Sequence, residues 1–153
     1  MKAFFIFISV IVLFAIVSWV LLSFVLVSDE QKIRWVIEKG RHGIQSGSLL
    51  TFSHILAADY QDSSGMDRAM LLSTLQSLFH EARNRRLLIL KESIRVHENR
   101  AEADIEFVLQ ADLDHSQLSR ALAGSRNDAR SLRVYLTKEG RQWVISRTEH
   151  AKP

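Results

Sequence analysis

Residues 87–113 decide the fold, and they read LLILKESIRVHENRAEADIEFVLQADL. Apolar and polar residues alternate in both halves of this stretch, and a period of two is typical of a half-buried β-strand. Turn-forming residues separate the halves at Glu98-Asn99-Arg100. The stretch therefore predicts two long antiparallel strands joined by a short turn. The side chains expected to face the core are Leu88, Leu90, Ile94 and Val96 before the turn, and Ala101, Ala103, Ile105, Phe107, Leu109, Ala111 and Leu113 after it.

The register of this hairpin follows from the same alternation. If even residues face inward before the turn and odd residues after it, the numbers of directly paired residues must sum to an odd value. A sum of 199 places Arg95 opposite Asp104, whereas a sum of 197 places Arg95 opposite Glu102 and Lys91 opposite Glu106. Either register pairs opposite charges on the solvent face, each worth roughly 0.2–1 kcal/mol. Both registers stay open at this point.

The residues before the hairpin predict three helices. The first begins at Asp29 and Glu30, with acidic side chains where the helix dipole favours them, and ends at Ser46-Gly47-Ser48. Its apolar stripe consists of Ile33, Val36, Ile37, Gly40 and Ile44. Residues 49–58 predict a shorter helix, residues 59–65 a loop, and residues 66–84 a third helix with a broad apolar face.

A second hairpin is expected near the end of the chain. Residues 132–138 and 142–148 predict its strands, with Glu139-Gly140 at the turn. The polar residues 114–130 precede it, and residues 116–123 within them could form one helical excursion. The order of elements predicts an α+β fold, with three helices packed on one face of a curved antiparallel sheet of about four strands.

An uncharged apolar run occupies residues 4–27, FFIFISVIVLFAIVSWVLLSFVLV. A helix needs about 20 residues to cross the hydrocarbon core of a bilayer. A cleaved signal peptide is the alternative, but the run is longer than an ordinary apolar signal core and no A-x-A-like site follows it. We therefore expect a transmembrane signal-anchor at residues 1–28 that contacts the lipid bilayer, a domain at residues 29–150 and a tail at 151–153.

The orientation of this single pass is less strongly encoded. Four basic residues, Lys32, Arg34, Lys39 and Arg41, follow the apolar run, whereas only Lys2 and the α-amine precede it. A count of these charges would keep the domain in the cytoplasm. The four are interleaved with acidic residues of a folded domain, however, and the apolar run behind a lone lysine resembles a signal-anchor. We expect an extracytoplasmic, periplasmic domain at the cell membrane, and the cytoplasmic alternative stays open.

Composition limits the chemistry. The absence of cysteine excludes a disulfide scaffold, thiolate catalysis and a cysteine-ligated metal. The HEARN segment at residues 80–84 lacks the second histidine of a zinc motif. Residues 29–153 carry 19 basic side chains, the chain's 20 minus Lys2, against 17 acidic ones, and no aromatic residues are interleaved for base stacking. We therefore expect no metal, no cofactor and no nucleic-acid partner.

Three segments carry a family resemblance. They are DYQDSSG at 59–65 before a helix, NRAEA at 99–103 in the long hairpin, and RVYLTKEGRQWVIS at 133–146. Together they make residues 31–149 resemble the nuclear transport factor 2-like superfamily, also called cystatin-like. The resemblance implies a cone in which a curved sheet wraps helices and often leaves a pocket.

The same resemblance leaves function open. Some members of the superfamily are isomerases, dehydratases or cyclases of small apolar substrates, whereas others bind partners, dimerise or act as scaffolds. Membrane-anchored relatives include the inner-membrane scaffold subunit of bacterial type IV secretion systems, although no motif assigns this chain to that group. Fold alone does not decide among these functions.

Four side chains are candidates for a ligand pocket. Glu92 interrupts the inward row between Leu90 and Ile94, where a buried carboxylate could act as a general base, unless a β-bulge turns it outward. Tyr60 could offer its hydroxyl to the pocket or pack in the core. Asp62 could be an acid or could bond to N–H groups of its own loop, and His54 could line the pocket or lie half-exposed on its helix.

These observations favour a non-enzymatic function. We expect a membrane-anchored binding or scaffold module that contacts a protein partner or a second copy of itself. The alternatives are a tethered lyase or isomerase that uses Glu92 as its base, and a sensor or carrier that holds a small apolar ligand in the same pocket. A pocket in which Glu92 and Tyr60 converge would favour the enzyme, and an apolar interior would favour the scaffold.

Overall fold

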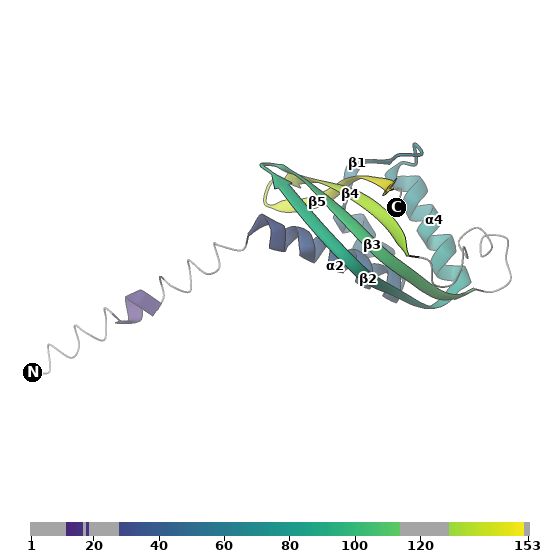
Figure 1. The fold of residues 1–153 in the computed structure, drawn as a ribbon, viewed down its shortest axis with the longest axis horizontal. Helices are drawn as coiled ribbons and strands as arrows, with labels where there is room; N and C mark the ends of the chain where they lie inside the picture. The colour runs from purple at the N-terminus through teal and green to yellow at the C-terminus, as the bar shows by residue number, and fades with distance from the viewer. Residues whose placement is uncertain (1–11, 17, 19–27, 114–128, 152–153) are drawn as a thin grey trace, which may run out of the picture.

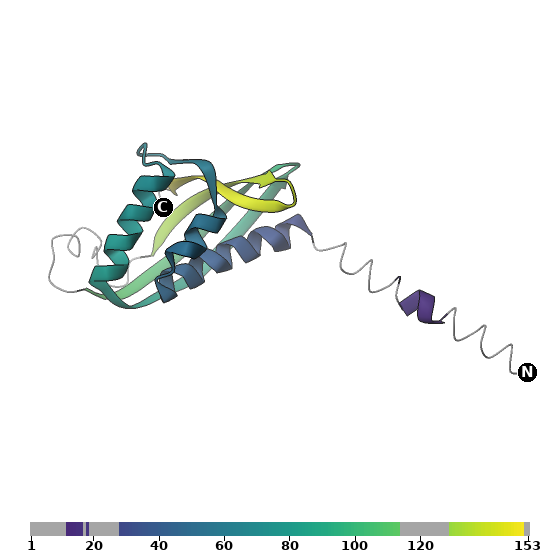
Figure 2. The same ribbon diagram turned by 180° about the vertical axis from the view of Figure 1, so that it is seen from behind.

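A computed structural model describes residues 12–16, 18, 28–113 and 129–151. Three helices lie on one side of a curved five-stranded sheet, as Figures 1 and 2 show from opposite sides. The elements are α2 (Asp29–Ser46), α3 (Leu49–Ile55), β1 (Leu56–Asp62), α4 (Arg68–Glu81), β2 (Ala82–His97), β3 (Arg100–Leu113), β4 (Arg130–Glu139) and β5 (Gln142–Ala151). The strand order is β1-β5-β4-β3-β2, and the α+β fold class is confirmed. The expected excursion at 116–123 lies outside the described residues, as does most of the tail.

Helix α2 forms where the sequence predicts it. Ser28 caps its start by accepting a hydrogen bond from the backbone N–H of Gln31 at 3.3 Å. Gly47 ends it in the left-handed conformation, at φ 69°, which a side chain would strain. The predicted apolar stripe places Ile33, Val36 and Ile37 in the core.

The core lies between α2 and the inner face of the sheet. Ile33 and Leu136 are its largest fully buried side chains, and Trp143 on β5 is 3% exposed. Two small residues on β3, Ala101 and Ala103, belong to the same buried cluster. The other buried members of this cluster are Val36, Ile37, Ile55, Ile105 and Val134.

The prediction for residues 49–65 was wrong in one respect. The second helix ends at Ile55, and Leu56–Asp62 forms strand β1 instead of the end of a helix and a loop. β1 pairs in parallel with β5, so the sheet is mixed and has five strands. The third helix is also shorter than the predicted 66–84, because Asp67 caps its start and β2 begins at Ala82.

The long hairpin is confirmed, but the inward row of its first strand was partly wrong. Near the turn the numbers of directly paired residues on β2 and β3 sum to 197, so Arg95 lies opposite Glu102. The pairing shifts between Ile89 and Lys91, and this bulge moves the inward row by one residue. As a result Ile89 faces the core, whereas Leu88 and Leu90 lie 47% and 57% exposed on the outer side.

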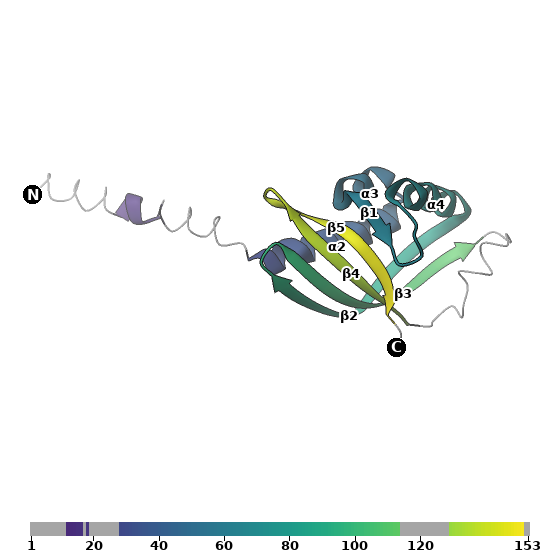
Figure 3. The same cartoon turned by 90° about the horizontal axis from the view of Figure 1, so that it is seen from above.

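The second hairpin is confirmed with longer strands. β4 and β5 pair antiparallel, and the pair next to the turn is Glu139 with Gln142. Gly140 adopts φ 61° in the turn between the two strands. Gly140 has open space around it, so its positive φ, not crowding, explains the glycine. Both hairpin turns lie at the end of the domain where α2 begins (Figure 3), and the backbone N–H of Lys138 donates to the carbonyl of Asn99 at 2.9 Å between them.

No helix within the described part of the chain is both long enough and apolar enough to span a bilayer. The predicted span at residues 4–27 lies mainly outside that part. Residues 12–16 are described, and they are helical. The large side chains among them, Val12, Leu13, Phe14 and Ile16, are between 50% and 73% exposed.

Candidate functional site

Asp29 ties the first turn of α2 to the closing hairpin. Its carboxylate accepts hydrogen bonds from Lys138 at 2.8 Å, from the indole N–H of Trp143 at 3.2 Å and from Lys32 at 3.1 Å. The bonds from Lys138, Trp143 and Lys32 hold the pKa of Asp29 far below its ordinary value, against an opposing effect of burial. The sequence marked Asp29 only as a favourable helix opener, so this tertiary role was missed.

Glu92 lies on the inner face of β2, as the alternation of residues suggested. The bulge at Ile89–Lys91 lies before Glu92 and turns the leucines outward rather than Glu92. Its side chain is 16% exposed, and its carboxylate pairs with the guanidinium of Arg34 on α2 at 3.2 Å. Burial raises the pKa of Glu92, and the positive charge of Arg34 opposes that shift. Glu92 is therefore a half-buried, ion-paired carboxylate between helix and sheet.

Tyr60 and Asp62 both serve the structure of β1 and its loop. Tyr60 is 3% exposed, and its hydroxyl lies 2.6 Å from the hydroxyl of Thr148 on β5. Burial raises the pKa of the Tyr60 hydroxyl. Asp62 accepts hydrogen bonds from the backbone and hydroxyl of Ser64 and from the N–H of Met66, at 2.7–2.8 Å. Burial raises the pKa of Asp62, but these bonds outweigh it and the net shift is downward.

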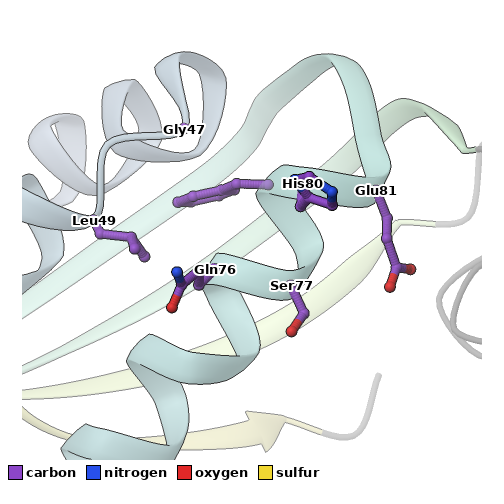
Figure 4. Close-up of a pocket in the computed structure, with 7 residues that line it drawn as sticks. Gly47, Leu49, Gln76, Ser77, His80 and Glu81 are labelled. Atoms are coloured by element: carbon purple, nitrogen blue, oxygen red, sulfur yellow. The ribbon is translucent and has the colours of Figure 1, made fainter.

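The structure does not bring the four candidates together. His54 is exposed on α3, and Tyr60 is buried on β1 with its hydroxyl bonded to Thr148 of the neighbouring strand β5. Asp62 accepts hydrogen bonds within its own loop, and Glu92 lies against Arg34 of α2. An open hollow of about 510 Å³ lies elsewhere, between the α2–α3 turn and the second half of α4 (Figure 4). Its lining residues are Gly47, Leu49, Gln76, Ser77, Phe79, His80 and Glu81. None of the four predicted site residues lines this hollow.

Arg85 joins the ends of two helices beside this hollow. Its guanidinium donates to the carbonyl of Ile44 at 2.8 Å, to that of Phe79 at 3.0 Å, and to that of Ala82. It also lies 5.0 Å above the centre of the Phe79 ring. The carbonyls at helix C-termini lack partners within their own helices, so Arg85 satisfies groups that would otherwise need water. In the sequence Arg85 stands beside two further arginines, Arg83 and Arg86, and nothing local distinguishes it from them.

The outer face of the sheet carries paired charges near the hairpin turns. Asp104 on β3 accepts from Arg95 on β2 at 2.8 Å and from Arg133 on β4 at 2.6 Å. The hydrogen bond from Arg133 lowers the pKa of Asp104. Tyr135 and Arg147 add further bonds to Glu149 along the same face. Among the described residues, no three His, Asp or Glu side chains group as a metal site would require.

Comparison with known proteins shows the fold and no closer relationship. No family model and no curated protein matches the chain. A nuclear transport factor 2-like protein from Cytophaga hutchinsonii superposes with a TM-score of 0.65 at 10% identity, over 82% of this chain and 99% of its own. A Caulobacter vibrioides protein with a cystatin-like fold gives 0.63 at 11% identity, over 81% and 90%.

A third match places the same fold inside a larger chain. The Bdellovibrio bacteriovorus protein Bd1075 superposes with a TM-score of 0.65 at 14% identity, over 83% of this chain but only 45% of its own. At these identities the likeness concerns architecture rather than activity. The comparisons and the observed topology agree that this chain has the nuclear transport factor 2-like, cystatin-like fold.

Proposed function

We propose that this protein is a single-pass, membrane-anchored module that acts by binding a protein partner or a second copy of itself, without catalysing a reaction. One observation carries the proposal. The apolar face of α2 packs in one buried cluster with side chains of β3, β4 and β5, and we infer that this cluster fills the space in which a pocketed relative would hold its ligand. The polar side chains near that interior, Asp29 and Glu92, are engaged by Lys138, Trp143 and Arg34.

Two features support the membrane anchor. Residues 4–27 are uncharged, and the part of them that the structure describes is helical with large apolar side chains exposed. Exposure of several large apolar side chains on one short helical segment is costly in water and favourable in lipid. We further propose that the domain lies outside the cytoplasm, in the periplasm of a bacterial cell, as the signal-anchor pattern suggests.

Affinity purification from the protein's own membranes tests this function. The tagged full-length chain would be extracted in mild detergent, beside a control that begins at residue 29 and lacks the anchor. The proposal predicts a stoichiometric protein partner, or a homo-oligomer, that is retained by the full-length chain and reduced in the control. A full-length chain that purifies alone as a monomer would contradict it.

A second candidate function rests on Glu92. A half-buried carboxylate with a raised pKa is the kind of group that can serve as a general base. In a tethered lyase or isomerase, Glu92→Gln would abolish turnover of a small apolar substrate and leave the fold intact. The ion pair with Arg34 and the absence of Glu92 from the lining of the hollow favour a structural role instead.

A further inference from the structure

Strand β2 forms a free edge of the sheet. Within the described part of the chain it pairs only with β3, and it is 16 residues long. Figures 1 and 3 show it as the outer border of the sheet, on the side away from β1, and its first residues follow directly from the end of α4. A strand in this position offers a row of backbone N–H and C=O groups that another extended chain can pair with.

The side chains along this edge have a distinct chemistry. Leu88 and Leu90 are 47% and 57% exposed, side by side on the outer face beyond the ion-paired region. The exposed charged side chains of β2 are all basic, namely Arg83, Arg86, Lys91 and Arg95, and of these Arg95 is already paired with Glu102 and Asp104. The one acidic residue of the strand, Glu92, is turned inward onto Arg34. The free edge therefore combines backbone pairing groups, an apolar centre and positive flanks.

We propose that the β2 edge accepts an extended segment of a partner protein in which apolar residues are flanked by acidic ones. The segment would add a sixth strand to the sheet and place its apolar side chains beside Leu88 and Leu90. Its acidic residues would lie near Arg86 and Arg83 at one end and near Lys91 at the other. This inference rests on the proposed function, because it names the surface through which the anchored module binds.

A second copy of this chain fits the edge poorly. An antiparallel pairing of two β2 strands that places Leu88 opposite Leu90 also places Arg86 of each copy within one residue of Lys91 of the other, and like charges on adjacent strands are destabilising. The same pairing places Arg86 opposite Glu92, which is already held by Arg34. Charge complementarity therefore favours a different, acidic chain.

The bilayer is also a poor occupant of this surface. The hairpin turn after His97 lies at the end of the domain where α2, and hence the proposed anchor, begins (Figure 1). Leu90 precedes His97 by seven residues of strand, which at about 3.3 Å per residue is roughly 23 Å from that end. The leucines are therefore far along the strand from the end of the domain that adjoins the proposed anchor.

Hydrogen–deuterium exchange on the full-length protein in zwitterionic nanodiscs tests the inference. The probe is a short synthetic peptide of alternating valine and threonine with two glutamates at each end, and its control replaces the glutamates with lysines. We expect the acidic peptide to slow exchange along β2 about tenfold at saturation, and the basic peptide to leave it unchanged. The double variant Leu88→Ser/Leu90→Ser should lose this protection, whereas Leu50→Ser, at a 67% exposed leucine on α3, should retain it.

Several outcomes would overturn the inference. They are no protection at saturating peptide, equal protection by both peptides, protection located away from β2, and protection of β2 by anionic nanodiscs alone, which would make the bilayer the occupant. The affinity purification separates this failure from that of the proposed function. A partner that still binds the Leu88→Ser/Leu90→Ser variant keeps the function and rejects the edge, whereas no partner for either chain rejects the function.

Discussion

Asp29 is the residue at which the start of the domain meets its closing hairpin. Its folded-state pKa is lowered by donors from three positions, so the carboxylate stabilises the fold fully at pH values above its unfolded pKa, near 3.8. That contribution is lost as the pH falls below this value toward the lower folded pKa. Because the side chain is 29% exposed, solvent weakens the interaction.

The corresponding prediction concerns Asp29→Asn. We expect it to lower the free energy of unfolding by about 1 kcal/mol at pH 7, the usual net value of a hydrogen bond to a charged group with partial exposure. Urea unfolding followed by circular dichroism at pH 7 and pH 3 checks this. The difference from the wild type should shrink at the lower pH; a difference that is unchanged at pH 3 would show that the charge of Asp29 is not responsible.

Arg85 yields a second prediction at the residue scale. Arg85→Lys keeps the charge but cannot reach three carbonyls with a planar fork, so we expect a loss of about 2 kcal/mol in the free energy of unfolding. Arg86→Lys, at the exposed neighbouring position, is the matched control and should change stability by less than about 0.5 kcal/mol. Equal effects of the two substitutions in thermal unfolding would contradict the role assigned to Arg85.

Among the elements, the bulge in β2 has the largest consequence. It moves Leu88 and Leu90 out of the core and Ile89 into it, which reverses the alternation expected from the sequence. The run LLIL at residues 87–90 is apolar at every position, so it contains no polar residue that would reveal the shift. Only the pairing of β2 with β3 in three dimensions selects which side chains face α2.

Alanine substitutions distinguish the two arrangements. Ile89→Ala should lower the free energy of unfolding by about 2 kcal/mol, because it removes a side chain that packs on the core. Leu90→Ala should change it by less than about 0.5 kcal/mol, since the side chain is more than half exposed. Chemical denaturation of both variants measures the two losses in free energy of unfolding. A larger loss for Leu90→Ala than for Ile89→Ala would contradict the bulge and support the inward leucines expected from the sequence.

The elements show where prediction from the sequence succeeds and where it stops. Helix α2 and the β4–β5 hairpin were both predicted closely, because their apolar residues recur at regular spacing. A glycine marks the boundary in each case: α2 ends at Gly47, and the hairpin turns at Gly140. Strand β1 was missed because its burial does not alternate and its parallel pairing with β5 is irregular, so no period of two is visible in LAADYQD. Parallel partners far apart in the chain leave little local signal.

The candidate site was predicted less well than the fold. The inward position of Glu92 follows from local alternation, but its pairing with Arg34 depends on how α2 lies across β2. Tyr60 took its core position, and Asp62 its loop bonds, because β1 is a strand of the sheet. The roles of Asp29 and Arg85 depend in part on partners that are distant in the sequence, since Ile44 is 41 positions from Arg85 and Trp143 is 114 positions from Asp29, and no local pattern encodes those contacts.

At the scale of the whole molecule, the function we propose depends on the buried apolar cluster between α2 and the sheet. The nuclear transport factor 2-like fold supports both chemistry in a pocket and binding at a surface. In this chain α2 contributes Ile33, Val36 and Ile37 to the buried cluster beside the sheet, and the described outer surface retains a free strand edge with two exposed leucines. On this basis we propose binding at the surface.

Native mass spectrometry of the full-length protein, released from mild detergent after purification from its own membranes, tests this claim most directly. The measurement separates a bound protein chain from a bound small molecule by mass and stoichiometry. We predict that the chain carries a second protein chain at a fixed ratio and no small apolar molecule. A lone chain that retains such a molecule would show that the cone holds a ligand pocket, and it would contradict the account.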